Sequence, residues 1–255
     1  MQYKNIRLEI SDQVATLYLN RPPANLLTIQ AIEEINEALL SLHRRNDLEV
    51  LVLRGSPNVF SDGLDIGELV PATAQRLIQV YVRLFETLRM MDVVQIAAVE
   101  GRANGAGWEV AIGTNLFVAS AGATFSLPHT SRGIFPPIAS TIMPRIAPRR
   151  MVMEWILTGR IVTAEELHHH GVVNRVFDPA RFDEQLDAFV AEFTSKSGPV
   201  LAIAKKAQFE AYYSTFSETI SRVQSLFLRD LMDLEDAREG LDAEREGRSP
   251  VWKNR

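Results

Sequence analysis

Residues 99–109 read V-E-G-R-A-N-G-A-G-W-E, and the apolar triplet Val110-Ala111-Ile112 follows them. Small residues predominate in this stretch, as they do where a backbone must approach another group closely, and a single carboxylate follows at Glu109. We expect a strand over residues 95–99, then a glycine loop, then a helix that begins near Ala106. The N-terminus of such a helix presents N–H groups without intrahelical acceptors. The stretch therefore predicts a turn that binds either a phosphate or an oxyanion.

The composition is that of an ordinary globular protein. The chain has 255 residues, 46% of them hydrophobic and 23% charged, and it can bury a sizeable core. Lys and Arg number 27 against 32 Asp and Glu, and this balance argues against nucleic acid as the main partner. Without cysteine there is no disulfide, no thiolate nucleophile and no cysteine-bound metal. The first residues lack a signal-peptide core, and no apolar run approaches the ~20 residues that span a bilayer. We expect a cytoplasmic protein without a membrane partner.

The first half of the chain alternates strand and helix patterns. Residues 6–10 and 14–19 alternate apolar and polar side chains and predict a hairpin. A helix should follow from about Thr28, where the hydroxyl is a suitable N-cap, and the apolar run over residues 50–54 is typical of a strand buried on both faces. A second helical pattern over residues 72–91 leads to the strand before the glycine turn. This alternation predicts an α/β fold.

The second half continues the alternation and then becomes helical. A strand is expected over residues 116–119, and from residue 138 onward we expect helical pieces broken at Pro144 and Pro148. Residues 163–166, T-A-E-E, have the pattern of a capping box.

The helix that this box opens should end at Gly171, and a short strand should follow over residues 172–177. From Phe182 the chain is helical by pattern and rich in mixed charges. We place a boundary near residue 195, which divides an α/β core over residues 1–195 from a helical region over residues 196–255.

Three further motifs connect the glycine turn to a known family. Residues 60–66, F-S-D-G-L-D-I, are similar to a loop written F-x-x-G-x-D, and residues 101–109 are similar to G-x-x-x-G-G-G-x-E. Residues 125–137 are similar to F-x-x-P-E-x-x-x-G-x-x-P, and residues 246–252 are close to a C-terminal signature. In this order the motifs resemble the crotonase family, also called the enoyl-CoA hydratase/isomerase superfamily, over essentially the whole chain.

The resemblance implies a fold, an assembly and a substrate class. It implies a core of repeated β-β-α turns and a C-terminal helical trimerisation region, in a trimer or a dimer of trimers. It also implies an acyl-CoA thioester substrate, in which coenzyme A is part of the substrate and not a separate cofactor. Within the family, residues 21–27 and 133–139 look most like the branch that hydrates cyclic dienoyl-CoA thioesters.

The resemblance also assigns roles to residues of the turn and its partner loop. The N–H groups of Leu64 and Ala106 map onto an oxyanion hole for the thioester carbonyl, so the turn is interpreted as an oxyanion site and not a phosphate site. Glu109 maps onto the first of two catalytic glutamates, and His129 stands where the family has the second. The residues expected to bind substrate are Ser61, Asp62, Gly63, Asp65, Ile66, Gly105, Gly107, Trp108, Phe135 and Pro136.

His129 is the main departure from the family pattern. A histidine with its unperturbed pKa of about 6.5 suits proton transfer near neutrality, but its reach differs from that of glutamate. Asp62 and Thr130 lie close by in sequence as further polar candidates. The structural alternatives are that the glycines only permit a tight turn, that Asp65 only holds the loop, and that Asp62 is solvated.

Several reactions fit this set of residues. Addition of water to an α,β-unsaturated thioester, with Glu109 as acid and base, is the leading prediction. Isomerisation of a double bond follows, because one carboxylate can carry a proton between two carbons. Hydrolysis and decarboxylation use the same scaffold. The alternative from another class is a non-catalytic acyl-CoA binder or assembly subunit that has lost the second acid.

Other polar runs have simpler interpretations. The imidazoles of residues 168–170 point about 100° apart on a helix and cannot converge on one metal ion, so we expect a helix-end role for them and no metal site. The basic pairs at residues 149–150 and 205–206 are solvated faces or contacts for the phosphates of coenzyme A.

Overall fold

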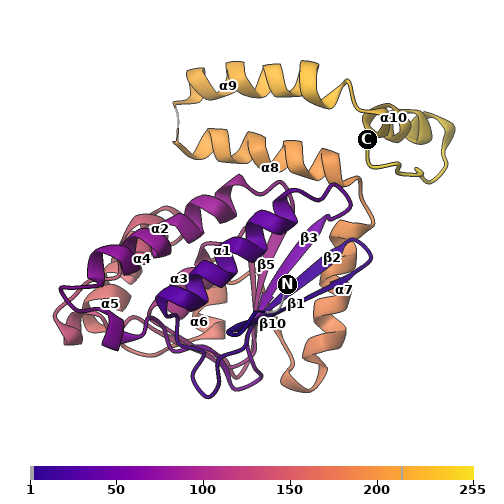
Figure 1. Ribbon diagram of the computed structural model, residues 1–255. Helices are drawn as coiled ribbons and strands as arrows, with labels where there is room; N and C mark the ends of the chain where they lie inside the picture. The colour runs from indigo at the N-terminus through magenta and orange to yellow at the C-terminus, as the bar shows by residue number, and fades with distance from the viewer. Residues whose placement is uncertain (1–2, 214) are drawn as a thin grey trace.

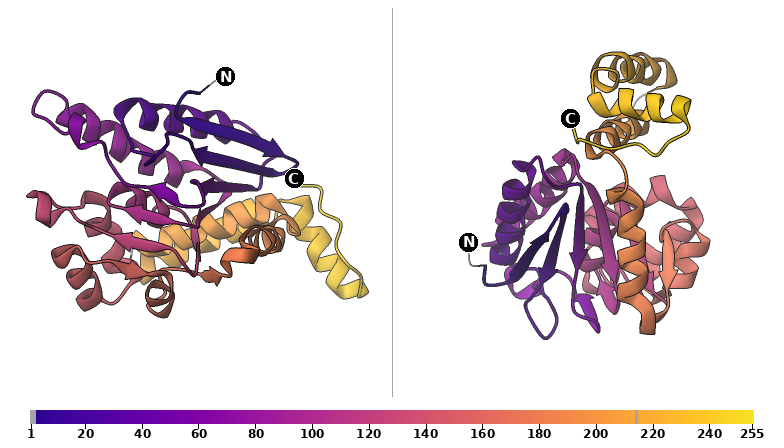
Figure 2. Two further views of the ribbon diagram at one scale, coloured as in Figure 1. Left: turned by 90° about the horizontal axis from the view of Figure 1, so that it is seen from below. Right: turned by 90° about the vertical axis from the view of Figure 1, so that its right-hand side faces the viewer.

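The computed structural model describes residues 3–213 and 215–255. Its body is a larger and a smaller β-sheet with helices around them, and the last helices project beyond this body (Figures 1 and 2). In the described residues no helix is both long enough and apolar enough to cross a membrane.

The larger sheet has six strands in the order β1-β2-β3-β5-β7-β10. The first pair, β1 and β2, is antiparallel as the hairpin prediction requires, and every other pair is parallel. All six residues of β5 are buried, which agrees with a parallel strand covered on both faces. The bounds are β1 Ile6–Ser11, β2 Val14–Leu19, β3 Val50–Arg54, β5 Val94–Val99, β7 Leu116–Ser120 and β10 Arg175–Phe177.

A second sheet consists of short strands that the sequence pattern did not reveal. It has the order β4-β6-β8-β9, with bounds β4 Val59–Ser61, β6 Arg102–Asn104, β8 Thr124–Ser126 and β9 Val162–Thr163. Strands of two or three residues are too short to show a period of two, so the sequence pattern does not predict them. Each of β3, β5 and β7 is followed by a short strand of the second sheet and then by helical structure. The repeated β-β-α turn of the crotonase fold is thereby confirmed.

Helices cover one face of the larger sheet and enclose the main apolar core. They are α1 Ile29–His43, α2 Ala74–Met90, α3 Ala106–Ile112, α4 Pro137–Ile146, α5 Arg149–Thr158 and α6 Ala164–His169, with 3₁₀ turns η1 Ile66–Glu68 and η2 Thr130–Arg132. A third 3₁₀ turn, η3 Pro179–Arg181, lies between β10 and the next helix. The Thr28 hydroxyl accepts a hydrogen bond from the Ala31 amide at 3.1 Å, so the predicted N-cap is confirmed. Along β3, Leu51 and Leu53 face this core while Val50 and Val52 face the opposite side.

Two expectations about the α4 to α6 region need correction. Pro144 lies inside α4 and does not break it, because the helix ends two residues later and the Ala147 amide still bonds to Met143 O at 3.0 Å. The capping box is only half formed. The Thr163 hydroxyl accepts from the Glu166 amide at 3.2 Å, but the Glu166 carboxylate turns to other side chains.

The C-terminal part leaves the body after one more helix. Helix α7, Phe182–Thr194, packs through an aromatic cluster on the face of the larger sheet opposite α1. Helix α8 Gly198–Tyr213 lies across the end of the larger sheet in contact with β5 (Figure 1). Helices α9 Phe216–Ser225 and α10 Glu235–Glu246, with a π-helical turn η4 Leu226–Leu231, lie beyond it. The domain boundary near residue 195 remains a prediction.

Candidate active site

The loop after β4 and the glycine turn before α3 touch through their backbones. Gly63 has φ +97°, and a Cβ on it would lie 2.9 Å from the carbonyl oxygen of Asn104 and 3.1 Å from the amide nitrogen of Ala106. The first distance is shorter than real Cβ contacts and the second is tighter than most of them, and a positive φ of this size favours glycine. The two segments that carry Leu64 and Ala106 are therefore held against each other.

The backbone pairing leaves the amides of Leu64 and Ala106 available as donors. Leu27 forms a bridge with the loop in which its amide donates to Gly63 O at 2.9 Å and its carbonyl accepts from the Asp65 amide at 3.1 Å. The amide of Leu64, between these two, lies outside the bridge. Ala106 is the first residue of α3, and the first N–H groups of a helix have no intrahelical acceptor.

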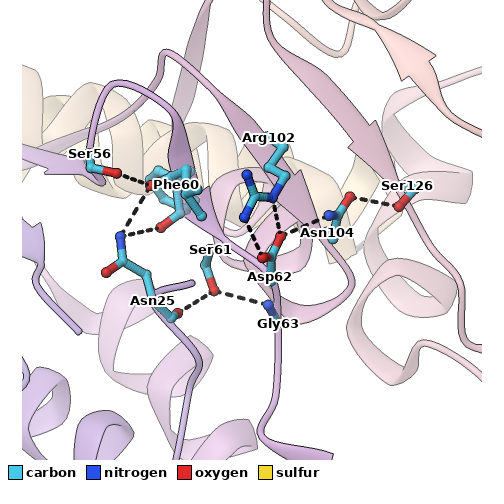
Figure 3. A network of polar contacts seen from close by, with 10 residues as sticks. Asn25, Ser56, Phe60, Ser61, Asp62, Gly63, Arg102, Asn104 and Ser126 are labelled. Carbon is cyan, nitrogen blue, oxygen red and sulfur yellow. Dashed lines mark hydrogen bonds and ion pairs between the residues drawn. The ribbon is translucent and has the colours of Figure 1, made fainter. Parts of the chain in front are cut away.

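Polar contacts of Asn25 and Ser61 hold the loop after β4 in place (Figure 3). The Asn25 side chain donates to the carbonyls of Val59 and Phe60, at 3.1 Å each. The Ser61 hydroxyl donates to Asn25 O at 2.7 Å and accepts from the Gly63 amide at 3.1 Å. Ser61 is fully buried. These contacts fix the path of the backbone just before Leu64.

A second polar chain ties the loop to the other strands of the smaller sheet (Figure 3). The Asp62 carboxylate accepts two hydrogen bonds from the Arg102 guanidinium, both 2.8 Å, and one from the Asn104 amide group at 2.9 Å. The Ser126 hydroxyl donates to the Asn104 side chain at 2.7 Å. The Arg102 guanidinium is the main reason why the pKa of Asp62 lies below its ordinary value. This chain crosses β4, β6 and β8.

Glu109 is enclosed by three hydrogen-bond donors. Its Oε1 accepts from the amides of Ile138 at 2.8 Å and Ala139 at 2.7 Å, and its Oε2 accepts from the Tyr81 hydroxyl at 2.7 Å. Glu109 and Tyr81 are both 0% exposed. Burial raises the pKa of Glu109, while the three donors work in the opposite direction. Burial, followed by the Glu109 charge, raises the pKa of Tyr81 well above its ordinary value.

His129 lies against the glycine turn. A Cβ on Gly105 would be 3.4 Å from Cε1 and 3.7 Å from Nε2 of its ring. The side chain is 7% exposed, and the buried Nδ1 has no hydrogen-bond partner among the described residues. Burial, and then the charge of Arg132, lowers the pKa of His129 to about 4, with a smaller opposing contribution from the Leu127 carbonyl. His129 is therefore neutral at pH 7.

Four other residues predicted to bind substrate make close contacts within the protein. Asp65 caps η1 by accepting from the Gly67 amide at 3.0 Å and lies 3.6 Å from the Arg21 guanidinium. Trp108 is fully buried and packs between Phe125 and Trp155 in the core. Gly107 packs so closely on Ser61 that a Cβ on the glycine would lie 2.3 Å from the Ser61 carbonyl oxygen. Gly105 lies against the ring of His129.

Of the three remaining predicted positions, Ile66 and Phe135 are near the surface and Pro136 is buried. Ile66 and Phe135 are 62% and 67% exposed, and Pro136 is the residue before α4. The hydroxyl of Thr130 donates to Leu157 O at 3.1 Å and is therefore engaged with α5.

Two basic or imidazole runs have structural contacts. The Lys205 ammonium donates to the carbonyls of Met91 at 2.5 Å and Val93 at 2.8 Å, and burial lowers its pKa to about 8. His168 Nδ1 lies 2.8 Å from Val173 O, and the rings of His169 and His170 contact each other edge to face. Over residues 3–213 and 215–255 no cluster of histidine and acidic side chains is arranged to hold a metal ion.

Sequence reasoning missed Tyr81, Asn25 and Arg102. Tyr81 lies within the helical pattern over residues 72–91, and nothing in such a pattern shows that a hydroxyl will meet a buried carboxylate. Asn25 lies two residues after the proline pair at residues 22–23. Its role as a donor can be recognised only once the position of the neighbouring loop is known. Arg102 lies inside the glycine motif, and its charge opposite Asp62 was available as a signal.

Two features define the class of this protein. The first is the β-β-α turn that repeats after β3, β5 and β7, and the second is the pair of loop amides beside a buried carboxylate and an imidazole. The repeated β-β-α turn is that of the crotonase fold. A family model described as enoyl-CoA hydratase/isomerase matches residues 9–255. The chain belongs to this family, and it is an enzyme of the hydratase/isomerase type.

Individual relatives agree with this assignment. A probable enoyl-CoA hydratase, echA8, of Mycobacterium bovis is 30% identical over 258 residues, which cover 100% of both chains. The mitochondrial enoyl-CoA hydratase domain-containing protein 3 of Danio rerio is 28% identical over 94% of this chain and 85% of its own. Among solved structures, DspI of Pseudomonas aeruginosa superimposes with a TM-score of 0.94 at 26% identity, covering 99% of this chain and 98% of that one.

Proposed function

We propose that this enzyme binds an acyl-CoA thioester and adds water to its α,β-unsaturated bond. The observation that carries the proposal is the backbone contact between Gly63 and Ala106, which holds the residue before Leu64 against the start of α3. A thioester carbonyl bound there gains negative charge on oxygen when a nucleophile adds to the β-carbon. Fixed donors at that oxygen contribute about 3–4 kcal/mol each to lowering the barrier.

The proton in this reaction needs an acceptor close to the oxyanion site. Water oxygen bonds to the β-carbon, the π electrons move to the thioester oxygen, and a proton leaves the water. That proton then goes to the α-carbon as the enolate collapses, so no other reactant is consumed. The two candidate proton acceptors are Glu109 and His129. His129 is neutral at pH 7 and lies against Gly105.

Double-bond isomerisation is the second candidate, and the enclosure of Glu109 favours it. The three hydrogen bonds to this side chain give Oε1 two donors and Oε2 one. Isomerisation needs a single group that takes a proton from one carbon and returns it to another, whereas family hydratases use two acids. The non-catalytic acyl-CoA binder is the third outcome, and a cyclic acyl group stays a prediction.

We also propose that the enzyme assembles as a trimer or a dimer of trimers through its C-terminal helices. The support is an apolar surface on α9 and η4, where Phe216 is 80% exposed and Ile220, Phe227 and Leu228 are 49%, 53% and 57% exposed. Large exposed apolar patches of this kind mark interaction sites. Size-exclusion chromatography with light scattering measures the number of subunits, and a monomer at micromolar concentration would contradict the proposed assembly.

Product mass separates the candidate reactions. The wild type is incubated with linear 2-enoyl-CoA, 3-enoyl-CoA and cyclic dienoyl-CoA thioesters, and the products are followed by mass spectrometry and by loss of conjugated-thioester absorbance. Hydration adds the mass of one water, isomerisation leaves the mass unchanged, and a binder retains the thioester without turnover. Failure to bind any of these thioesters contradicts the proposed function.

A further inference from the structure

The N-terminus of α4 is closed by a carboxylate from another helix. Pro136 precedes this helix and Pro137 opens it, so neither residue supplies a side-chain cap, and Pro137 has no N–H. The first two amides that α4 does have, those of Ile138 and Ala139, both donate to Glu109 Oε1. A negative charge at the N-terminus of a helix is stabilised by the helix dipole as well as by these bonds. Glu109 therefore serves as the cap of α4.

Tyr81 completes this arrangement from α2. Its hydroxyl donates to Glu109 Oε2 at 2.7 Å, and both side chains are 0% exposed. A buried carboxylate without donors would be strongly destabilised, so the phenol compensates for part of the lost hydration. Three helices, α2, α3 and α4, meet at this one carboxylate.

A carboxylate that holds a helix is poorly placed to carry protons. If Glu109 Oε1 took up a proton, it would lose a lone pair that accepts from an α4 amide, and Oε2 keeps one lone pair beside the bond from Tyr81. The ring of His129 is not engaged in this way. Its Cε1–Nε2 edge lies on Gly105, and its Nδ1 is free of hydrogen bonds within the described chain.

We propose a division of labour in which Tyr81 and Glu109 are positioning residues that fix α4 opposite the oxyanion loop, and His129 alone transfers protons. The inference rests on the proposed function, because it assigns roles within that reaction. In the hydration step, the imidazole of His129 accepts the proton that water loses as its oxygen bonds to the β-carbon. The imidazolium then returns that proton to the α-carbon.

Substitutions at Glu109 distinguish positioning from proton transfer. In Glu109→Gln the amide oxygen still accepts from Ile138 and Ala139 and its NH₂ group can donate to Tyr81, but an amide cannot act as a base. We expect Glu109→Ala to lower kcat strongly and Glu109→Gln to restore kcat to within about tenfold of the wild type. His129→Gln should lower kcat by at least about 10²-fold with little change in acyl-CoA affinity.

The pH profile of Tyr81→Phe gives a second readout. Loss of the phenol removes a donor from Glu109 and raises the pKa of its carboxyl further. If His129 carries the proton, the acid limb of kcat/KM keeps its position in Tyr81→Phe. If Glu109 carries it, that limb moves to higher pH. Tyr18→Phe, on β2 of the larger sheet, is the matched control.

Amide hydrogen exchange tests the positioning role without turnover. The amides of Ile138 and Ala139 should exchange faster in Glu109→Ala than in the wild type, and Glu109→Gln should restore their protection. The proposal is overturned if Glu109→Gln loses as much kcat as His129→Gln, if the acid limb moves in Tyr81→Phe, or if exchange is unchanged in Glu109→Ala. A wild type that turns over no thioester contradicts the proposed function, and the exchange result still decides the positioning role.

Discussion

Gly63 and Ala106 meet through their backbones, with room for no side chain between them. A Cβ on Gly63 would come within 3.1 Å of the Ala106 nitrogen and 2.9 Å of Asn104 O, and the φ of Gly63 is +97°. This contact sets the separation of the two amides that the proposed oxyanion site requires. Any residue larger than glycine at position 63 must push the two loops apart.

Gly63→Ala is therefore expected to damage catalysis more than folding. Displacement of one oxyanion donor should lower kcat/KM by about 10²-fold. The control is Gly171→Ala, where φ is +76° but no atom lies within 4 Å of the added Cβ, so that it carries the backbone strain without the contact. Steady-state kinetics and thermal unfolding of both variants check this. Equal losses of kcat/KM in the two variants would show that strain alone is responsible.

Asp62 should stabilise the fold through its bonds to Arg102 and Asn104. We expect Asp62→Ala to lower the free energy of unfolding by about 1–2 kcal/mol, since the pair is partly solvated. Because its pKa is lowered in the folded state, this contribution is present above the ordinary pKa of aspartate and is lost as the pH falls through the lowered value. Urea unfolding at pH 7 and pH 3 measures both effects. Glu184→Ala, which breaks an exposed pair with Arg181, is the control and should unfold like the wild type.

His129 makes the protein sensitive to mild acid. Its pKa of about 4 lies below the ordinary value of 6.5, so the unfolded chain binds a proton more readily than the folded one between these values. The free energy of unfolding should fall by roughly 3 kcal/mol as the pH drops from about 6.5 to about 4. In His129→Gln this part of the decline should disappear, whereas the exposed His43→Gln should follow the wild type. Parallel curves for His129→Gln and the wild type would contradict the shifted pKa.

Lys205 should contribute to the attachment of α8 to the body. Its ammonium bonds to two carbonyls between the end of α2 and β5, and Lys205→Met leaves both without that donor. We expect a loss of about 1–3 kcal/mol in the free energy of unfolding. Lys206→Met, one residue further along the same helix and exposed, is the control. Chemical denaturation of both proteins measures the difference, and equal stabilities would argue against the role of Lys205.

The sequence predicts the path of the chain better than the partners of its side chains. The glycine turn, the Thr28 cap and the long apolar strands follow from local patterns, and the structure has them where they were expected. The strands β4, β6 and β8 have only three residues each, so no periodicity exposes them. Pro144 shows that one missing amide near a helix end does not stop the helix.

The surroundings of Glu109 show why the site itself was only partly predictable. Its position in the motif indicated a catalytic acid, but its donors come from Tyr81 in α2 and from the start of α4. These residues are far apart in the sequence and meet only through packing of three helices. Whether a carboxylate is open to substrate or engaged as a cap depends on such contacts, which no local pattern encodes.

The central claim is that Leu64 and Ala106 polarise a thioester carbonyl. It is tested most directly by the infrared spectrum of an enoyl-CoA labelled with ¹³C at the carbonyl and bound to His129→Gln, which should hold the thioester without rapid turnover. We predict that the carbonyl stretch of the bound thioester lies at lower wavenumber than in water, and that the added substitution Gly63→Ala reverses most of this shift. A bound carbonyl that absorbs at the same wavenumber as in water, or higher, would contradict the account.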